Sequence, residues 1–180
     1  AAGAHGLIAL EAAHLANRGE SLSYIADAVK NLIPKVTLLA YVETLHYLKK
    51  GGRVPKVAAW AGSILGIRPI AELSLGEAKV IGKLRSRPTG IRKLADLARS
   101  RVGGQAVHMN VMHANAAQDA EVLCELLSKE LTCRNIIISE FTPVMGAHLG
   151  PGVVGLAFFP DEDMPESEGQ TPPSTIAKQD

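Results

Sequence analysis

Gly146-Ala147-His148-Leu149-Gly150-Pro151-Gly152, followed at once by the apolar run Val153–Phe159, is the stretch of this 180-residue chain that constrains its fold most strongly. Glycine permits positive φ angles and close approach to the main chain, whereas proline fixes φ and removes a backbone donor. We therefore expect a rigid turn before a strand, in which His148 and free backbone N–H groups face an anion or a reacting centre. The alternative is a histidine that only makes hydrogen bonds within a tight turn.

The rest of the chain alternates between helical and extended patterns. Helices are predicted over residues 6–18, 21–32, 45–50, 56–65, 90–102 and 117–131. Strands are predicted over 36–42, 106–112, 135–139 and 153–159, and residues 67–73 and 78–84 read as a hairpin. Such alternation favours an α/β fold with a mixed sheet covered by helices, and the hairpin makes the sheet partly antiparallel.

Length and composition are typical of one globular domain, because 47% of the residues are hydrophobic and 21% are charged. The two cysteines form no CxxC pair, so we expect a reduced, cytoplasmic protein. We also expect neither a targeting peptide nor an integral membrane segment. The chain begins without Met, so we expect it to be a piece of a longer protein.

Charge is divided unevenly along the chain. Residues 161–180 contain six acidic residues and one lysine, a net charge of −5. The remaining 18 basic and 12 acidic residues give the body a net charge of +6. The acidic segment is rich in Pro, Ser, Glu and Gln, a composition that predicts a disordered tail.

Arg53 follows a predicted helix end, Lys49-Lys50-Gly51-Gly52, and precedes Val54-Pro55. A guanidinium held between a Gly-Gly pair and a proline can form a bidentate pair with a carboxylate. An ordinary helix C-cap with solvated basic residues explains the same pattern. Residues 57–65 are apolar and rich in small side chains, and include Trp60, Ile64 and Leu65. They can line a narrow hydrophobic tunnel or form a plain buried helix.

Residues 83–101 carry seven basic residues and one acidic residue, which can be a solvated helix face or a docking surface for an acidic partner. The stretch has no aromatic residue, so we expect no specific nucleic-acid binding. The histidines show no metal-ligand spacing, and no phosphate-binding loop, nucleophile elbow or dinucleotide fingerprint is present.

The motifs together resemble a known family. Leu45-His-Tyr-Leu-Lys-Lys-Gly-Gly-Arg53, Ile67-Arg-Pro-Ile70, and Gly146–Gly152 with Val154-Gly-Leu-Ala-Phe158 occur in the order and at the spacing found in the DegV family. These are bacterial fatty-acid-binding proteins that serve fatty acid kinase. The resemblance covers nearly all of residues 3–159.

The resemblance implies that residues 1–160 are the C-terminal lipid-binding lobe of a two-lobed protein whose N-terminal lobe is absent from this chain. It implies a long-chain fatty acid in a hydrophobic tunnel, with Arg53 and His148 at its carboxylate and Gly146, Gly150 and Gly152 shaping the site. The partner kinase would phosphorylate the bound carboxylate for phospholipid synthesis. The binding protein itself would then be no enzyme and would need no cofactor.

Three alternatives stay open at this point. His148 can be the nucleophile of a phosphocarrier or of a small-molecule enzyme. The basic stretch can dock another macromolecule. The lobe can also be an interaction module that has lost lipid binding, because the hydroxyl ligands that the family places in the N-terminal lobe are missing.

Overall fold

Within residues 2–50, 66–74 and 77–161, which the computed structural model describes, six strands form one mixed sheet in the order β3-β2-β1-β6-β4-β5. The strands are β1 (Thr37–Tyr41), β2 (Arg68–Ser74), β3 (Glu77–Leu84), β4 (Val107–His113), β5 (Cys133–Glu140) and β6 (Val154–Pro160). The helices are α1 (Ala2–Asn17), α2 (Leu22–Leu32), α3 (His46–Lys50), α4 (Arg87–Val102), α5 (Ala117–Glu130) and α6 (Pro143–Leu149), and the 3₁₀ turn η1 (Ile33–Lys35) follows α2.

The sheet is antiparallel except at one edge. β4 and β5 run parallel and are joined by α5, while β1, β2, β3 and β6 pair antiparallel with their neighbours. The predicted hairpin is β2–β3, and the predicted mixed α/β sheet is confirmed. Every residue of β6 except the last is buried, as expected of a central strand covered on both faces.

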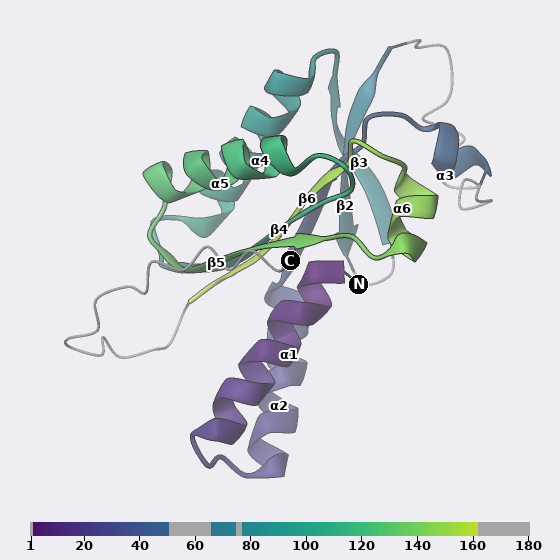
Figure 1. Ribbon diagram of the computed structural model, residues 1–180. Helices are drawn as coiled ribbons and strands as arrows, with labels where there is room; N and C mark the ends of the chain where they lie inside the picture. The colour runs from purple at the N-terminus through teal and green to yellow at the C-terminus, as the bar shows by residue number, and fades with distance from the viewer. Residues whose placement is uncertain (1, 51–65, 75–76, 162–180) are drawn as a thin grey trace.

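Two helical layers cover the sheet (Figure 1). On one face α4 and α5 bury Leu94, Leu123 and Leu127 against β1, β4 and β6. On the other face the start of α1 packs against β1, β4 and β6, and α2 lies beside α1 in a hairpin that extends beyond the sheet. α3 and α6 lie together near the opposite end of this second face.

Caps explain why several predicted helices form where they do. Ser21 accepts a hydrogen bond from the backbone N–H of Tyr24 and begins α2, and Ser86 does the same for α4 through Thr89. α4 therefore begins three residues before the predicted start, and Gly103 at φ +62° ends it. α1 begins at Ala2 rather than Gly6.

The prediction of a turn over residues 146–152 is wrong in its first half. Residues 143–149 form the short helix α6, with Pro143 in its first turn, where a missing N–H costs nothing. Only the following residues form the turn, with Gly150 and Gly152 at φ +83° and +85°. The predicted helix 56–65 and the predicted disordered tail after Asp161 lie outside the described residues.

No helix among the described residues is both long enough and apolar enough to cross a membrane.

Candidate functional site

His148 lies in the last turn of α6, on the same face of the sheet as α1. The helix is anchored by Leu149, which packs with Leu48 of α3 against Ala40, Val42 and Val153. The His148 side chain is half-buried, and its imidazole makes no hydrogen bond or ion pair with any described residue. The fold therefore holds the backbone of His148 firmly while its ring nitrogens remain available to a ligand.

The glycine N–H groups near His148 are not free, contrary to the sequence prediction. Gly146 donates to Thr142 O at 2.9 Å, Gly150 to Gly146 O at 2.7 Å, and Gly152 to Ala114 O at 2.7 Å. Carbonyl groups of α6, of its N-cap Thr142 and of the neighbouring β4–α5 loop thus accept the hydrogen bonds that an anion would need. The N–H groups of these three glycines are therefore not available to a ligand.

The ring of Tyr47 fixes the end of α6. It lies directly over Gly150, where a Cβ atom would overlap it. α3 and α6 are therefore packed as one unit, and the chain leaves α3 three residues before Arg53. Arg53 itself, and Trp60, Ile64 and Leu65, lie outside the described residues, so their places in the site stay predictions.

Below α6 the sheet surface carries small side chains. Ala40 of β1 lies opposite Ala71 of β2, and the next pair on the same face is Leu38 and Leu73. Two residues along a strand span about 7 Å. Both alanines are buried, at 3% and 6% exposure, and Ala40 packs under Leu48 and Leu149, so the pair belongs to a covered apolar part of the sheet.

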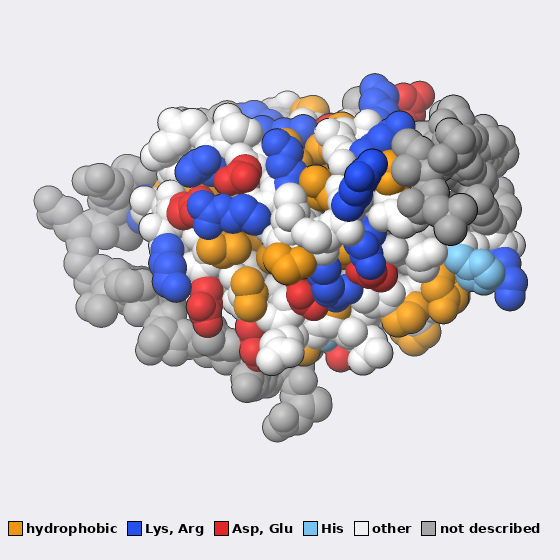
Figure 2. Space-filling model, turned by 90° about the horizontal axis from the view of Figure 1, so that it is seen from above, with side chains coloured by type: hydrophobic (Ala, Val, Ile, Leu, Met, Phe, Trp, Pro, Cys, Tyr) orange, Lys and Arg blue, Asp and Glu red, His pale blue; other side chains and the backbone are white. Residues whose placement is uncertain are grey.

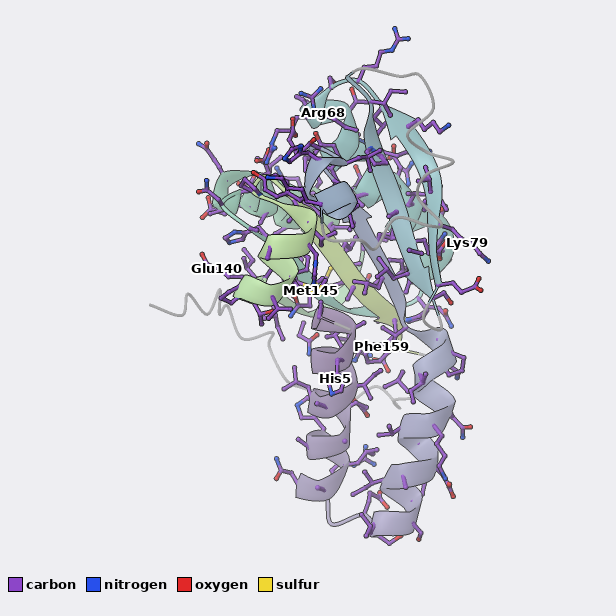
Figure 3. All side chains as sticks on the ribbon, turned by 90° about the vertical axis from the view of Figure 1, so that its right-hand side faces the viewer. His5, Arg68, Lys79, Glu140, Met145 and Phe159 are labelled. Carbon is purple, nitrogen blue, oxygen red and sulfur yellow. The ribbon has the colours of Figure 1, made fainter. Side chains whose placement is uncertain are left out.

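An apolar groove begins at the Leu38–Leu73 pair, and sequence reasoning missed it. It has a volume of about 630 Å³ and lies between the α1–α2 hairpin and the β2–β3 edge. Its lining residues are Ala4, His5, Ile8, Ala9, Ala12, Val29, Ile33, Val36, Leu38, Leu73, Ser74, Glu77 and Ala78. Figure 3 shows Met145 of α6 above the start of α1 and His5 further along α1, so α6 and the hairpin follow one another down this side of the molecule.

A partly buried ion-pair network supports the opposite side of the turn. The Glu43 carboxylate accepts hydrogen bonds from Tyr41 Oη at 2.7 Å, Arg68 Nε at 2.6 Å and Arg87 Nη1 at 2.9 Å. Arg87 also donates to Asp119 Oδ2 at 2.9 and 2.7 Å. The network contacts the turn, because a Cβ on Gly152 would lie 3.0 Å from Arg87 Nη1 and 3.2 Å from Glu43 Cβ.

The network also shifts the pKa values of its members. Burial disfavours the charged form of Glu43, but the hydrogen bonds from Tyr41 and Arg68 and the charges of Arg68 and Arg87 outweigh it, so the pKa of Glu43 is lowered. The hydrogen bond to Asp119 raises the pKa of Arg87. These residues come from four separate elements and the loop after β1, so no sequence spacing could have signalled them.

The basic stretch is largely paired with carboxylates. Arg87 binds Glu43 and Asp119, while the other pairs are Arg92–Glu130, Arg99–Asp96 and Arg101–Glu72, at 2.9, 3.5 and 2.6 Å. Figure 2 shows Lys and Arg side chains interspersed with Asp and Glu over this end of the molecule. Such pairing favours the solvated helix face over a docking surface.

The described ranges also contain other titratable groups, namely histidines, carboxylates and the Cys124 thiol. No three His, Cys, Asp or Glu side chains there are placed to hold a metal ion. Burial raises the pKa of the Cys124 thiol to about 12, which keeps it protonated. No described carboxylate pairs with His148, so a histidine nucleophile would lack an orienting acid there.

Comparisons with known proteins show the family of this chain. Residues 1–161 match the family described as "Uncharacterised protein, DegV family". A DegV domain-containing protein of Clostridium acetobutylicum is 33% identical over 164 residues, which are 88% of this chain and 56% of that protein.

Two solved structures share the fold. DegV, a fatty-acid-binding protein from Bacillus subtilis, is 29% identical with a TM-score of 0.74, and a fatty-acid-binding DegV-family protein from Streptococcus agalactiae is 26% identical with a TM-score of 0.77. Each match covers 87% of this chain and 56% of the other. The chain thus spans about half the length of these relatives, and it belongs to the DegV family.

Proposed function

We propose that this chain is the lipid-binding lobe of a fatty-acid-binding protein. The fatty acid lies on the sheet face shared by α6 and α1, with its carboxylate at His148 and its acyl chain directed along β1 toward the apolar groove. The observation that carries the proposal is the presence, on one face, of an unpartnered half-buried histidine and an apolar groove with small side chains between them. The fatty-acid-binding relatives with the same fold support it.

The free energy of binding a fatty acid has two parts, one from the acyl chain in the apolar groove and one from the carboxylate at His148. Each buried CH₂ contributes about 0.8 kcal/mol, so the acyl chain supplies most of the affinity. A carboxylate is costly to bury unless it is paired and hydrogen-bonded. His148 provides one partner, Arg53 after α3 provides the second, and the N-terminal lobe of the longer protein completes the site. Trp60, Ile64 and Leu65 cover the acyl chain.

The same proposal extends to the biological role. The protein presents the carboxylate to a fatty acid kinase in the cytoplasm, and the resulting acyl phosphate enters phospholipid synthesis. The chain itself performs no chemistry in this scheme.

Organic extraction of the purified protein, followed by mass spectrometry, tests the proposal. The 180-residue chain is prepared alone and preceded by the N-terminal half of a DegV relative. We expect the two-lobed form to release fatty acids, and His148→Ala to release several-fold less. His46→Ala is the matched control, because His46 is an exposed histidine of α3. A normally folded two-lobed protein that releases no fatty acid would contradict the proposal.

A further inference from the structure

The groove between the α1–α2 hairpin and the β2–β3 edge is lined by Leu38, which lies two residues along β1 from Ala40 of the cluster that anchors α6. Its 630 Å³ fall within the range of about 300–1,000 Å³ typical of small-molecule sites. Its walls are apolar on three sides: Ile8 and Ala12 from α1, Val29 and Ile33 from α2 and η1, and Leu73 from β2. Such walls favour a slender apolar ligand.

The groove continues the proposed acyl path. Leu38 lines the groove, and Ala40, two residues along the same face of β1, packs in the cluster that anchors α6. Val42 of that cluster lies four residues from Leu38, about 13 Å along the strand. The α6 end and the groove are thus two ends of one apolar strip on the sheet.

We propose that the groove holds the distal end of the acyl chain and that the α1–α2 hairpin sets the length of chain the protein accepts. This inference rests on the proposed function. Ala12 is the key position, because α1 presents only a methyl group there and so leaves the groove open. Val29 on α2 forms the facing wall.

Substitutions at these two positions change the groove in opposite directions. Ala12→Leu fills it with additional carbon atoms, and Val29→Ala enlarges it. Excluding one methylene weakens binding about fourfold, so Ala12→Leu weakens the longest acids about tenfold or more relative to short ones. Val29→Ala shifts the preference toward longer chains. Ala13→Leu is the matched control, because Ala13 is the exposed neighbour on α1 and does not line the groove.

The experiment measures dissociation constants for a homologous series of saturated fatty acids with the two-lobed form and these variants. The inference is supported if Ala12→Leu shifts the preferred chain length toward shorter acids and the control Ala13→Leu does not. An unchanged length profile in both groove variants, with wild-type binding intact, overturns it and leaves the proposed function standing. If the wild-type protein binds no fatty acid, the proposed function and this inference fail together.

A second measurement needs no variant and therefore does not depend on how well Ala12→Leu folds. A fatty acid with a photoreactive diazirine at its terminal carbon is irradiated in the wild-type complex, and the adduct is located by mass spectrometry. Adducts on α1 or α2 support the inference. Adducts confined to other segments overturn it, including the case in which the N-terminal half of the longer protein covers the groove.

Discussion

Arg87 is the side chain that joins most elements around the candidate site. From the start of α4 it contacts Glu43 after β1, Asp119 in the first turn of α5, and the turn at Gly152. Its guanidinium also lies 5.8 Å from the Tyr41 ring centroid, within cation–π range. A planar, permanently charged group with five donors suits this bridging role better than lysine would.

Replacing Arg87 with alanine is expected to destabilise the protein. The change leaves Asp119 and one oxygen of Glu43 without their guanidinium partner, at a cost of about 1–3 kcal/mol. Urea denaturation at neutral pH measures the effect. Lys93→Ala is the control, because Lys93 is an exposed residue of the same helix and its loss should change stability by less than about 0.5 kcal/mol.

The pH dependence separates lost charge pairing from lost packing. The folded-state pKa of Glu43 lies below the ordinary value of 4.5, so its contribution to stability is complete above that pH and disappears as the pH falls through the folded-state pKa. Arg87→Ala removes one of the two guanidinium charges near Glu43. The variant should therefore lose less stability than the wild type as the pH falls through the pKa of Glu43. Parallel stability curves for the two proteins at acid pH would contradict the electrostatic role.

At the scale of elements, α6 shows why the glycine-rich stretch was only half predictable. Three glycines and a proline argue for a turn, but Gly146 has an ordinary helical φ and Pro143 begins a helix. Gly150 and Gly152 alone adopt positive φ. The local composition therefore located the second half of the turn and missed the helix that carries His148, because α3 and β1 provide the packing that stabilises so short a helix.

Alanine substitutions distinguish the two kinds of glycine. Gly150 adopts φ +83° and ψ 169°, a region essentially restricted to glycine, and lies under the Tyr47 ring. Gly150→Ala is expected to cost at least about 1–3 kcal/mol. Gly146→Ala has open space around its Cβ and should leave stability unchanged or raise it by up to about 1 kcal/mol. Thermal denaturation of both variants checks this, and equal destabilisation would show that the turn does not require Gly150.

Other elements were predictable for identifiable reasons. Caps at Ser21 and the Gly103 end of α4, and β-branched or apolar runs such as Val153–Phe159, act over a few residues and can be read locally. The strand order, the parallel β4–β5 edge and the groove depend on contacts between distant residues, as does the network of Glu43, Arg68, Arg87 and Asp119. His148 was chosen as a ligand residue from its glycine-rich surroundings, yet its availability follows from its place on α6.

At the scale of the whole molecule, the two faces of the sheet have different roles. The α4–α5 face contains the larger core cluster, in which Leu39, Tyr41, Leu94, Leu123 and Phe158 are among the buried residues. The α1–α6 face has smaller clusters, the groove and His148. The proposed carboxylate site lies on this second face, where we propose that an N-terminal half completes it.

The central claim is that His148 recognises the carboxylate of a fatty acid whose chain lies on this face. The most direct measurement compares dissociation constants for a fatty acid and for the methyl ester of the same acid, using the two-lobed wild type and His148→Ala. A hydrogen bond to a charged group contributes about 1.5–3 kcal/mol, so the variant should bind the acid about 10- to 100-fold more weakly while ester binding stays unchanged. Equal losses for acid and ester, or no loss for either, would contradict the account.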